Sequence, residues 1–89
     1  MTEREVEIVN RLGLHARAAA KLVHTAGGFQ SRVTMRKDGE EVDAKSILGI
    51  LLLAAGQGSR VTLCCEGVDE DEAMRAVTQL IANRFDEES

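Results

Sequence analysis

Three stretches of the chain alternate apolar and polar residues, the pattern of strands that bury one face. They span residues 3–9, 29–36 and 60–66. A shorter stretch, 41–43, follows an Asp-Gly pair, which is typical of a hairpin turn. Because the alternation leaves one side of each strand polar, the pattern predicts a sheet that is covered on one face only.

Three other stretches have helical character. Residues 16–26 are rich in alanine, the best helix former, and two glycines follow them. Residues 47–55 are almost wholly apolar and follow Ser46, a good N-cap residue. A last helix is expected after Asp69, with Glu72 three residues on as in a capping box.

The predicted order of elements is therefore β-α-β-β-α-β-α. Helices that lie on the apolar face of the sheet would give an α+β fold, an open-faced β-sandwich with three helices on one side. The length of 89 residues, 44% of them hydrophobic, fits a single domain over residues 1–89 with one core.

Charge and cysteine content narrow the function classes. The net charge of −4, from 15 acidic and 11 basic residues, argues against nucleic acid as a partner. The longest apolar stretch, 47–55, is too short for membrane insertion, and no signal peptide is expected. Cys64 and Cys65 point to opposite faces of a strand, so we expect two reduced thiols, at least one of them in the core. These features favour a cytoplasmic protein, and no residue spacing predicts a metal or cofactor.

The segment 13–20 carries the main chemical signal. It places His15 and Arg17 in what is predicted to be the first turn of a helix, where free backbone N–H groups and the helix dipole favour an anion. Neutral imidazole is a nucleophile, and Gly13 permits close approach of the backbone. The segment indicates a phosphoryl group carried on His15; the alternative is a helix-capping histidine without chemical importance.

A second signal lies in the apolar helix that follows Ser46. Its side chains cannot all face inward, so Ile47, Leu48 and Leu51 are expected to form an exposed surface for a partner, unless loops cover them. Ser46 is either an ordinary N-cap or a regulatory phosphorylation site, since a phosphate is tolerated at a helix N-terminus.

Four segments of the chain resemble the HPr family of the bacterial phosphoenolpyruvate-dependent phosphotransferase system. They are Asn10-x-x-Gly13-Leu14-His15-Ala16-Arg17, Lys45-Ser46-Ile47-Leu48-Gly49-Ile50, Ala55-Gly56-Gln57-Gly58-Ser59 and Glu66-Gly67-x-Asp69-Glu70. The likeness covers nearly the whole chain, from about residue 3 to 85. It implies a four-stranded antiparallel sheet in the order 1-4-2-3.

The resemblance also implies the chemistry of the site. His15 would accept a phosphoryl group on Nδ1 from enzyme I and pass it to an enzyme IIA component. Arg17 and the backbone amides of Ala16 and Arg17 would hold the phosphate. Ser46 matches the site that HPr kinase/phosphorylase modifies. The expected docking surface consists of Ala20, Ile47, Leu48 and Leu51. The implied protein is a monomeric relay, not an enzyme.

One residue departs from the family pattern. Ala18 stands where the family usually has proline, a change that removes neither the nucleophile nor an anion ligand. The resulting motif is similar to nitrogen-branch paralogues (NPr), which leaves open whether the acceptor serves sugar uptake or regulation. Two alternatives to the carrier remain: a regulatory binding module that acts through Ser46, and an unrelated α+β binding domain.

Overall fold

In the computed structural model, which describes residues 1–87, four antiparallel strands form one sheet in the order β1-β4-β2-β3. The strands are β1 (Thr2–Glu7), β2 (Arg32–Lys37), β3 (Glu40–Asp43) and β4 (Arg60–Glu66). The central strand β4 pairs with β1 on one side and β2 on the other. The predicted α+β fold and sheet order are confirmed.

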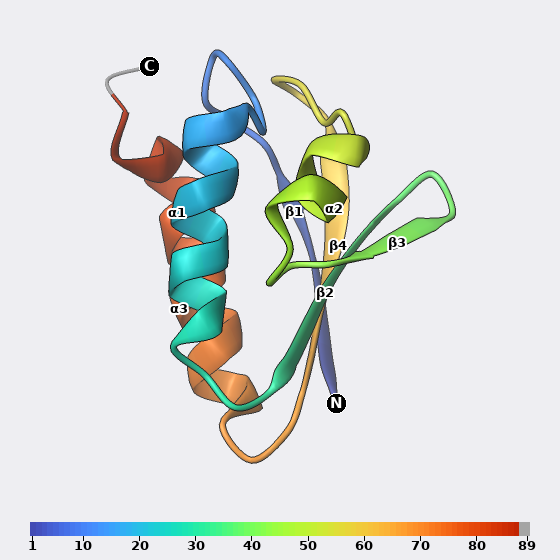
Figure 1. The fold of residues 1–89 in the computed structure, drawn as a ribbon, viewed down its shortest axis with the longest axis vertical. Helices are drawn as coiled ribbons and strands as arrows, with labels where there is room; N and C mark the ends of the chain where they lie inside the picture. Colours follow the sequence, from blue (N-terminus) through green and yellow to red (C-terminus); the bar gives the residue numbers. More distant parts are fainter. Residues whose placement is uncertain (88–89) are drawn as a thin grey trace.

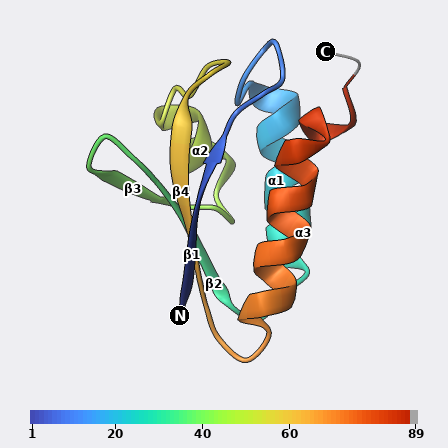
Figure 2. The ribbon, with the colours of Figure 1, turned by 180° about the vertical axis from the view of Figure 1, so that it is seen from behind.

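The helices cover one face of this sheet (Figure 1). They are α1 (Ala16–Gly27), α2 (Ile47–Leu52) and α3 (Glu70–Ala82). Helices α1 and α3 run side by side, as the view from behind also shows (Figure 2), and α2 packs against α1 and β3.

One hydrophobic core lies between the sheet and the helices. The sheet contributes Val33, Met35, Val61, Leu63 and Cys65, each exposed by no more than 1%. The next residues along the strands face the open side, where Cys64 is half-buried. One packed thiol was therefore predicted correctly, and burial raises the pKa of Cys65 to about 11.

Three predicted elements end or begin short of the expected residue. Helix α2 ends at Leu52 instead of residue 55, because Ala54 takes a left-handed conformation with φ of 51°. The first strand ends at Glu7 instead of residue 9, and the second begins at Arg32 instead of residue 29. In each place the chain leaves regular structure and forms hydrogen bonds to a distant segment, which periodicity along a sequence does not report.

Asp69 directly precedes α3 as predicted, but the expected capping box is wrong. Its carboxylate does not cap the helix. One oxygen accepts hydrogen bonds from the Ser31 backbone N–H at 2.9 Å and the Ser31 hydroxyl at 2.5 Å, and the other accepts from the Gln30 N–H at 2.9 Å. Glu70, not Glu72, accepts from the Gly67 N–H at 3.2 Å. Asp69 thus joins the start of α3 to the segment before β2.

Replacing Asp69 with asparagine is expected to lower the melting temperature by several degrees near neutral pH. The hydrogen bonds, that from Ser31 foremost, hold the pKa of Asp69 below its usual value. A lowered carboxyl pKa stabilises the fold above the unfolded-state pKa of about 3.9, and this contribution disappears as the pH falls through the folded-state pKa. Thermal unfolding followed by circular dichroism should therefore show a difference that shrinks in acid.

The control for this prediction is Asp38→Asn, which removes the same charge from the exposed turn between β2 and β3. It should leave the melting temperature almost unchanged. A loss for Asp69→Asn that is independent of pH would contradict the assigned role of the carboxylate.

After α3 the chain passes through a left-handed turn at residues 84–86, here called the C-terminal turn. Arg84, Phe85 and Asp86 all have positive φ, between 53° and 62°. This conformation costs L-residues roughly 1–2 kcal/mol each. Two contacts hold the turn: the Phe85 side chain is fully buried, and the Lys21 ammonium donates to the Phe85 carbonyl at 2.6 Å. The turn brings Glu87 to the residues that precede α1.

Candidate functional site

The loop that carries His15 rests on the segment after α2. The Leu14 N–H donates to the Ala55 carbonyl at 2.9 Å. Gly13 has φ of 66°, and a Cβ built there would lie 2.6 Å from the same carbonyl oxygen. Only glycine fits this close approach with that backbone conformation. The contact fixes the position of the loop relative to α2.

His15 is the N-cap residue of α1, with extended backbone angles. Its Nδ1 accepts a hydrogen bond from the Arg17 N–H at 3.3 Å, and its carbonyl accepts from the Ala19 N–H at 2.8 Å. The side chain is 24% exposed. The imidazole is therefore held at the positive end of the helix while it remains open to a partner.

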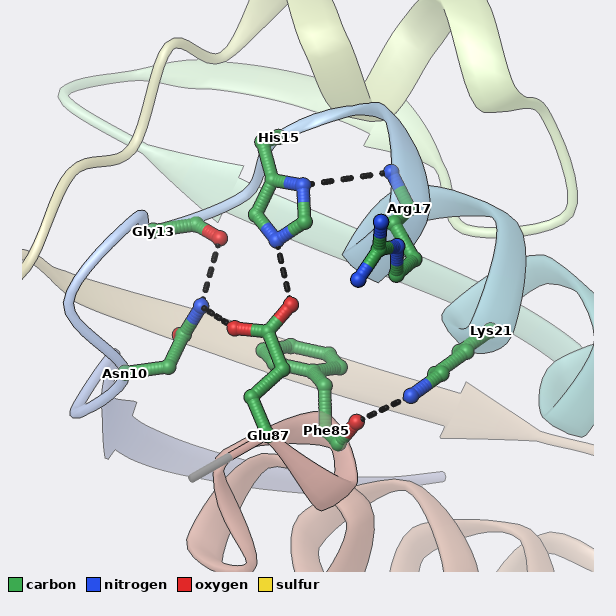
Figure 3. Close-up of polar contacts among 7 residues, drawn as sticks. All are labelled: Asn10, Gly13, His15, Arg17, Lys21, Phe85 and Glu87. Atoms are coloured by element: carbon green, nitrogen blue, oxygen red, sulfur yellow. Dashed lines mark hydrogen bonds and ion pairs between the residues drawn. The ribbon is translucent and has the colours of Figure 1, made fainter. Parts of the chain in front are cut away.

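A carboxylate from the far end of the chain contacts the other ring nitrogen. Oε2 of Glu87 lies 2.5 Å from Nε2 of His15. Its other oxygen accepts from the Asn10 side-chain amide at 3.1 Å, and that amide also donates to the Gly13 carbonyl at 2.8 Å (Figure 3). Burial raises the pKa of Glu87, but the hydrogen bonds from His15 and Asn10 outweigh it and hold the pKa below its usual value.

Neither Glu87 nor the side-chain role of Asn10 was predicted from the sequence. In the sequence, residues 86–88 are only a short acidic stretch, without a motif that relates them to His15. The one available signal in the sequence was Phe85, an apolar residue next to this acidic stretch. Burial of its side chain holds the neighbouring residues close to the core. Sequence patterns relate residues that are close along the chain. Glu87 lies 72 residues after His15, so no pattern predicts their contact.

Arg17 is exposed, and its side chain lies beside the imidazole (Figure 3). The first amides of α1 have no acceptor in the backbone of the helix, and the Arg17 N–H makes only the long contact to Nδ1, so an anion can bind at this turn. The four alanines of this turn do not all line the surface: Ala16 and Ala20 are exposed, whereas Ala18 and Ala19 pack into the core. Only Ala16 and Ala20 therefore contribute to the exposed surface near the imidazole.

An exposed apolar surface lies on α2, and Leu12, in the loop before His15, is exposed as well. The exposed fractions are 43% for Ile47, 69% for Leu48, 36% for Leu51, 68% for Leu52 and 62% for Leu12. Ile50 and Leu53 point inward. Loops therefore do not cover Ile47, Leu48, Leu51 and Leu52, which we call the apolar patch.

Ser46 caps α2 and precedes the apolar patch. Its hydroxyl accepts from the Gly49 N–H at 3.2 Å, so the predicted N-cap is confirmed. The residue is half-buried. Within residues 1–87 there is no cluster of three side chains suited to a metal ion, and no helix long and apolar enough to cross a membrane.

Comparisons with known proteins agree with this geometry. A family model described as "PTS HPr component phosphorylation site" matches residues 2–83. Phosphocarrier protein HPr of Cupriavidus necator is 59% identical over 87 residues, 98% of each chain, and that of Pseudomonas aeruginosa is 50% identical over 88 residues, again 98% of each. The crystal structure of an HPr from Thermoanaerobacter tengcongensis superposes with a TM-score of 0.97 at 48% identity over all of both chains.

Proposed function

Because this chain belongs to the HPr family, the phosphocarriers of the phosphotransferase system, we propose that His15 is the residue that carries the phosphoryl group. A protein of this family is a relay between enzyme I and the enzyme II components, not a free-standing enzyme. The observation that supports His15 is its open imidazole at the N-terminus of α1, with the Arg17 side chain and the first backbone amides of the helix beside it.

The transfer needs no group beyond those already described. The lone pair of Nδ1 attacks phosphorus, and the donor's bond to phosphorus breaks with its electron pair staying on the donor. The backbone amides of Ala16 and Arg17 then bind phosphate oxygens, and the Arg17 guanidinium offsets their charge. The Arg17 N–H contact to Nδ1 is long, at 3.3 Å, so little hydrogen-bond energy opposes this change of acceptor.

We propose the apolar patch, together with Ala20 on α1, as the docking surface for enzyme I and for enzyme IIA components. Ile47, Leu48 and Leu51 are exposed on α2, and α2 packs against α1. Apolar surface of this kind is unusual on a small monomer unless a partner covers it. In this proposal one domain acts as a monomer and meets each partner transiently, through one face.

The direct experiment is incubation of the protein with enzyme I and phosphoenolpyruvate, followed by intact-mass measurement. We expect a gain of one phosphoryl group that is lost in acid and gives the ³¹P signal of Nδ1-phosphohistidine. Absence of the gain, under conditions in which the Cupriavidus necator relative is charged, would overturn the proposal. Discharge of the product by individual IIA proteins then identifies sugar-uptake or regulatory acceptors.

We also propose Ser46 as a site for an ATP-dependent HPr kinase/phosphorylase. Support comes from its position next to Ile47 and Leu48, where added negative charge would lie against an apolar docking surface. The hydroxyl of the half-buried Ser46 accepts from the Gly49 N–H, so a kinase must break this hydrogen bond before it can phosphorylate the hydroxyl.

Ser46→Asp is expected to raise the KM of enzyme I for this protein about tenfold and to leave kcat nearly unchanged, since the charge disturbs docking and not the imidazole. Ser46→Ala is the matched control: it should accept phosphoryl at the parent rate from enzyme I and none from the kinase. Steady-state transfer kinetics measure both. An unaltered KM for Ser46→Asp would contradict the role of Ser46 in docking.

We place this relay in the cytoplasm. Support comes from the two free thiols, Cys64 and Cys65, which are typical of a reducing compartment.

A further inference from the structure

We infer that Glu87 is a positioning residue for the transfer: it holds His15 in the tautomer with the proton on Nε2 and thereby keeps the Nδ1 lone pair free for phosphorus. This inference rests on the proposed role of His15. The matched family region ends at residue 83, before Glu87.

Two independent contacts require the same tautomer. An ionised carboxylate only accepts hydrogen bonds, so the Glu87–Nε2 contact needs a proton on Nε2. A backbone N–H only donates, so the Arg17 contact needs a lone pair on Nδ1. Together they leave the proton on the nitrogen away from the incoming phosphoryl group. The hydrogen bond at one ring nitrogen sets what the other can do.

The carboxylate itself is fixed in place. The fully buried Asn10 donates one amide to both Glu87 and the Gly13 carbonyl. If this side-chain amide were reversed, its oxygen would face two other oxygens, so the structure admits only one orientation. Glu87 is therefore held between Asn10 and the imidazole, as Figure 3 shows.

The backbone supports the same conclusion. Three consecutive residues without glycine adopt the left-handed conformation in the C-terminal turn, immediately before Glu87. Strain of this kind persists only where surrounding contacts over-determine it, and it concentrates at functional sites. Here the buried Phe85 and the Lys21 contact to its carbonyl hold the turn, and the result of the turn is the Glu87–His15 contact.

The charge that develops on the imidazole during the transfer gives the Glu87 carboxylate a second role. When Nδ1 forms its bond to phosphorus and the donor keeps the electron pair of the broken bond, the Nε2 proton stays in place. The ring then carries a positive charge, which the Glu87 carboxylate offsets at 2.5 Å. No proton has to leave the site during charging or discharge.

Glu87→Gln tests the inference because it preserves size while it removes the charge. A glutamine amide can turn its NH₂ toward Nε2 and favour the opposite tautomer. We expect the ¹⁵N shifts of the two ring nitrogens to show loss of the Nε2–H form. We expect kcat for phosphorylation by enzyme I to fall about 10- to 100-fold with KM unchanged, the range found for carboxylates that orient a metal-ligating histidine.

Asp86→Asn is the matched control. It removes the same charge one residue away, asparagine tolerates positive φ, and Asp86 is exposed. It should retain the ring-nitrogen shifts and the transfer rate of the parent. Melting curves of both variants establish that they are folded.

Several results would overturn the inference. One is a Glu87→Gln protein that keeps the Nε2–H form and transfers at the parent rate or faster. Another is an equal loss of transfer rate in Asp86→Asn, which would show that the effect comes from the negative charge of this region and not from the Glu87–His15 contact. Failure of the parent to accept phosphoryl would overturn the proposed function instead, and the ring-nitrogen shifts would still decide whether Glu87 sets the tautomer.

Discussion

His15→Ala is expected to abolish phosphorylation by enzyme I and phosphoenolpyruvate completely, whereas Glu87→Gln only slows it. The difference follows from their roles: alanine removes the nucleophilic nitrogen itself, and no neighbouring side chain within residues 1–87 replaces it at the N-terminus of α1. A time course of intact mass measures both effects, since the first variant should show no gain at any time.

The matched control for this prediction is His24→Ala. His24 is the second histidine of the chain and lies exposed on the same helix. Its replacement should leave the rate and the extent of phosphorylation as in the parent. A mass gain that persists in His15→Ala and disappears in His24→Ala would assign the carrier role to His24 and overturn the proposed function.

Phe85→Ala is expected to produce the largest loss of stability, a decrease of about 3–5 kcal/mol in the free energy of unfolding. Phe85 is the largest fully buried side chain, and its removal leaves a cavity at the end of the core. The same change removes one of the two contacts that hold the C-terminal turn and so loosens it. Transfer from enzyme I should therefore also fall, to the level of Glu87→Gln. Urea unfolding measures the first effect and initial rates the second.

Phe85→Leu separates these two consequences. Leucine keeps most of the apolar volume, so the expected loss of stability is less than about 1.5 kcal/mol. The turn should then remain closed and transfer should match the parent. If Phe85→Ala were destabilised but transferred at the parent rate, the anchor would not be needed to hold Glu87 at the imidazole.

The element order and the buried faces of the strands were predictable because each depends on short-range periodicity. Val61, Leu63 and Cys65 alternate along β4, and all three are buried as the pattern requires. The apolar patch was predictable for a related reason. A short helix with apolar residues all around must expose some of them, and Leu48 is 69% exposed.

Predictions failed where a local motif had a competing tertiary partner. Asp69 stands where a helix cap belongs, but its carboxylate accepts from Ser31 and Gln30, which are remote in sequence. Helix α2 ends early because the chain turns at Ala54, next to the Ala55 carbonyl that meets Leu14. In each case a hydrogen bond between distant segments outweighed a local preference.

By itself, the sequence determined the fold class and pointed to His15 as the proposed nucleophile, because alternation, helix signals and the segment from Gly13 to Arg17 are all local features. Only the tertiary structure decided what surrounds that nucleophile. A left-handed turn anchored by Phe85 brings the Glu87 carboxylate to Nε2 of His15. Such a contact depends on how α1 and α3 pack and on the direction that the chain takes after α3, and no pattern along the sequence encodes these.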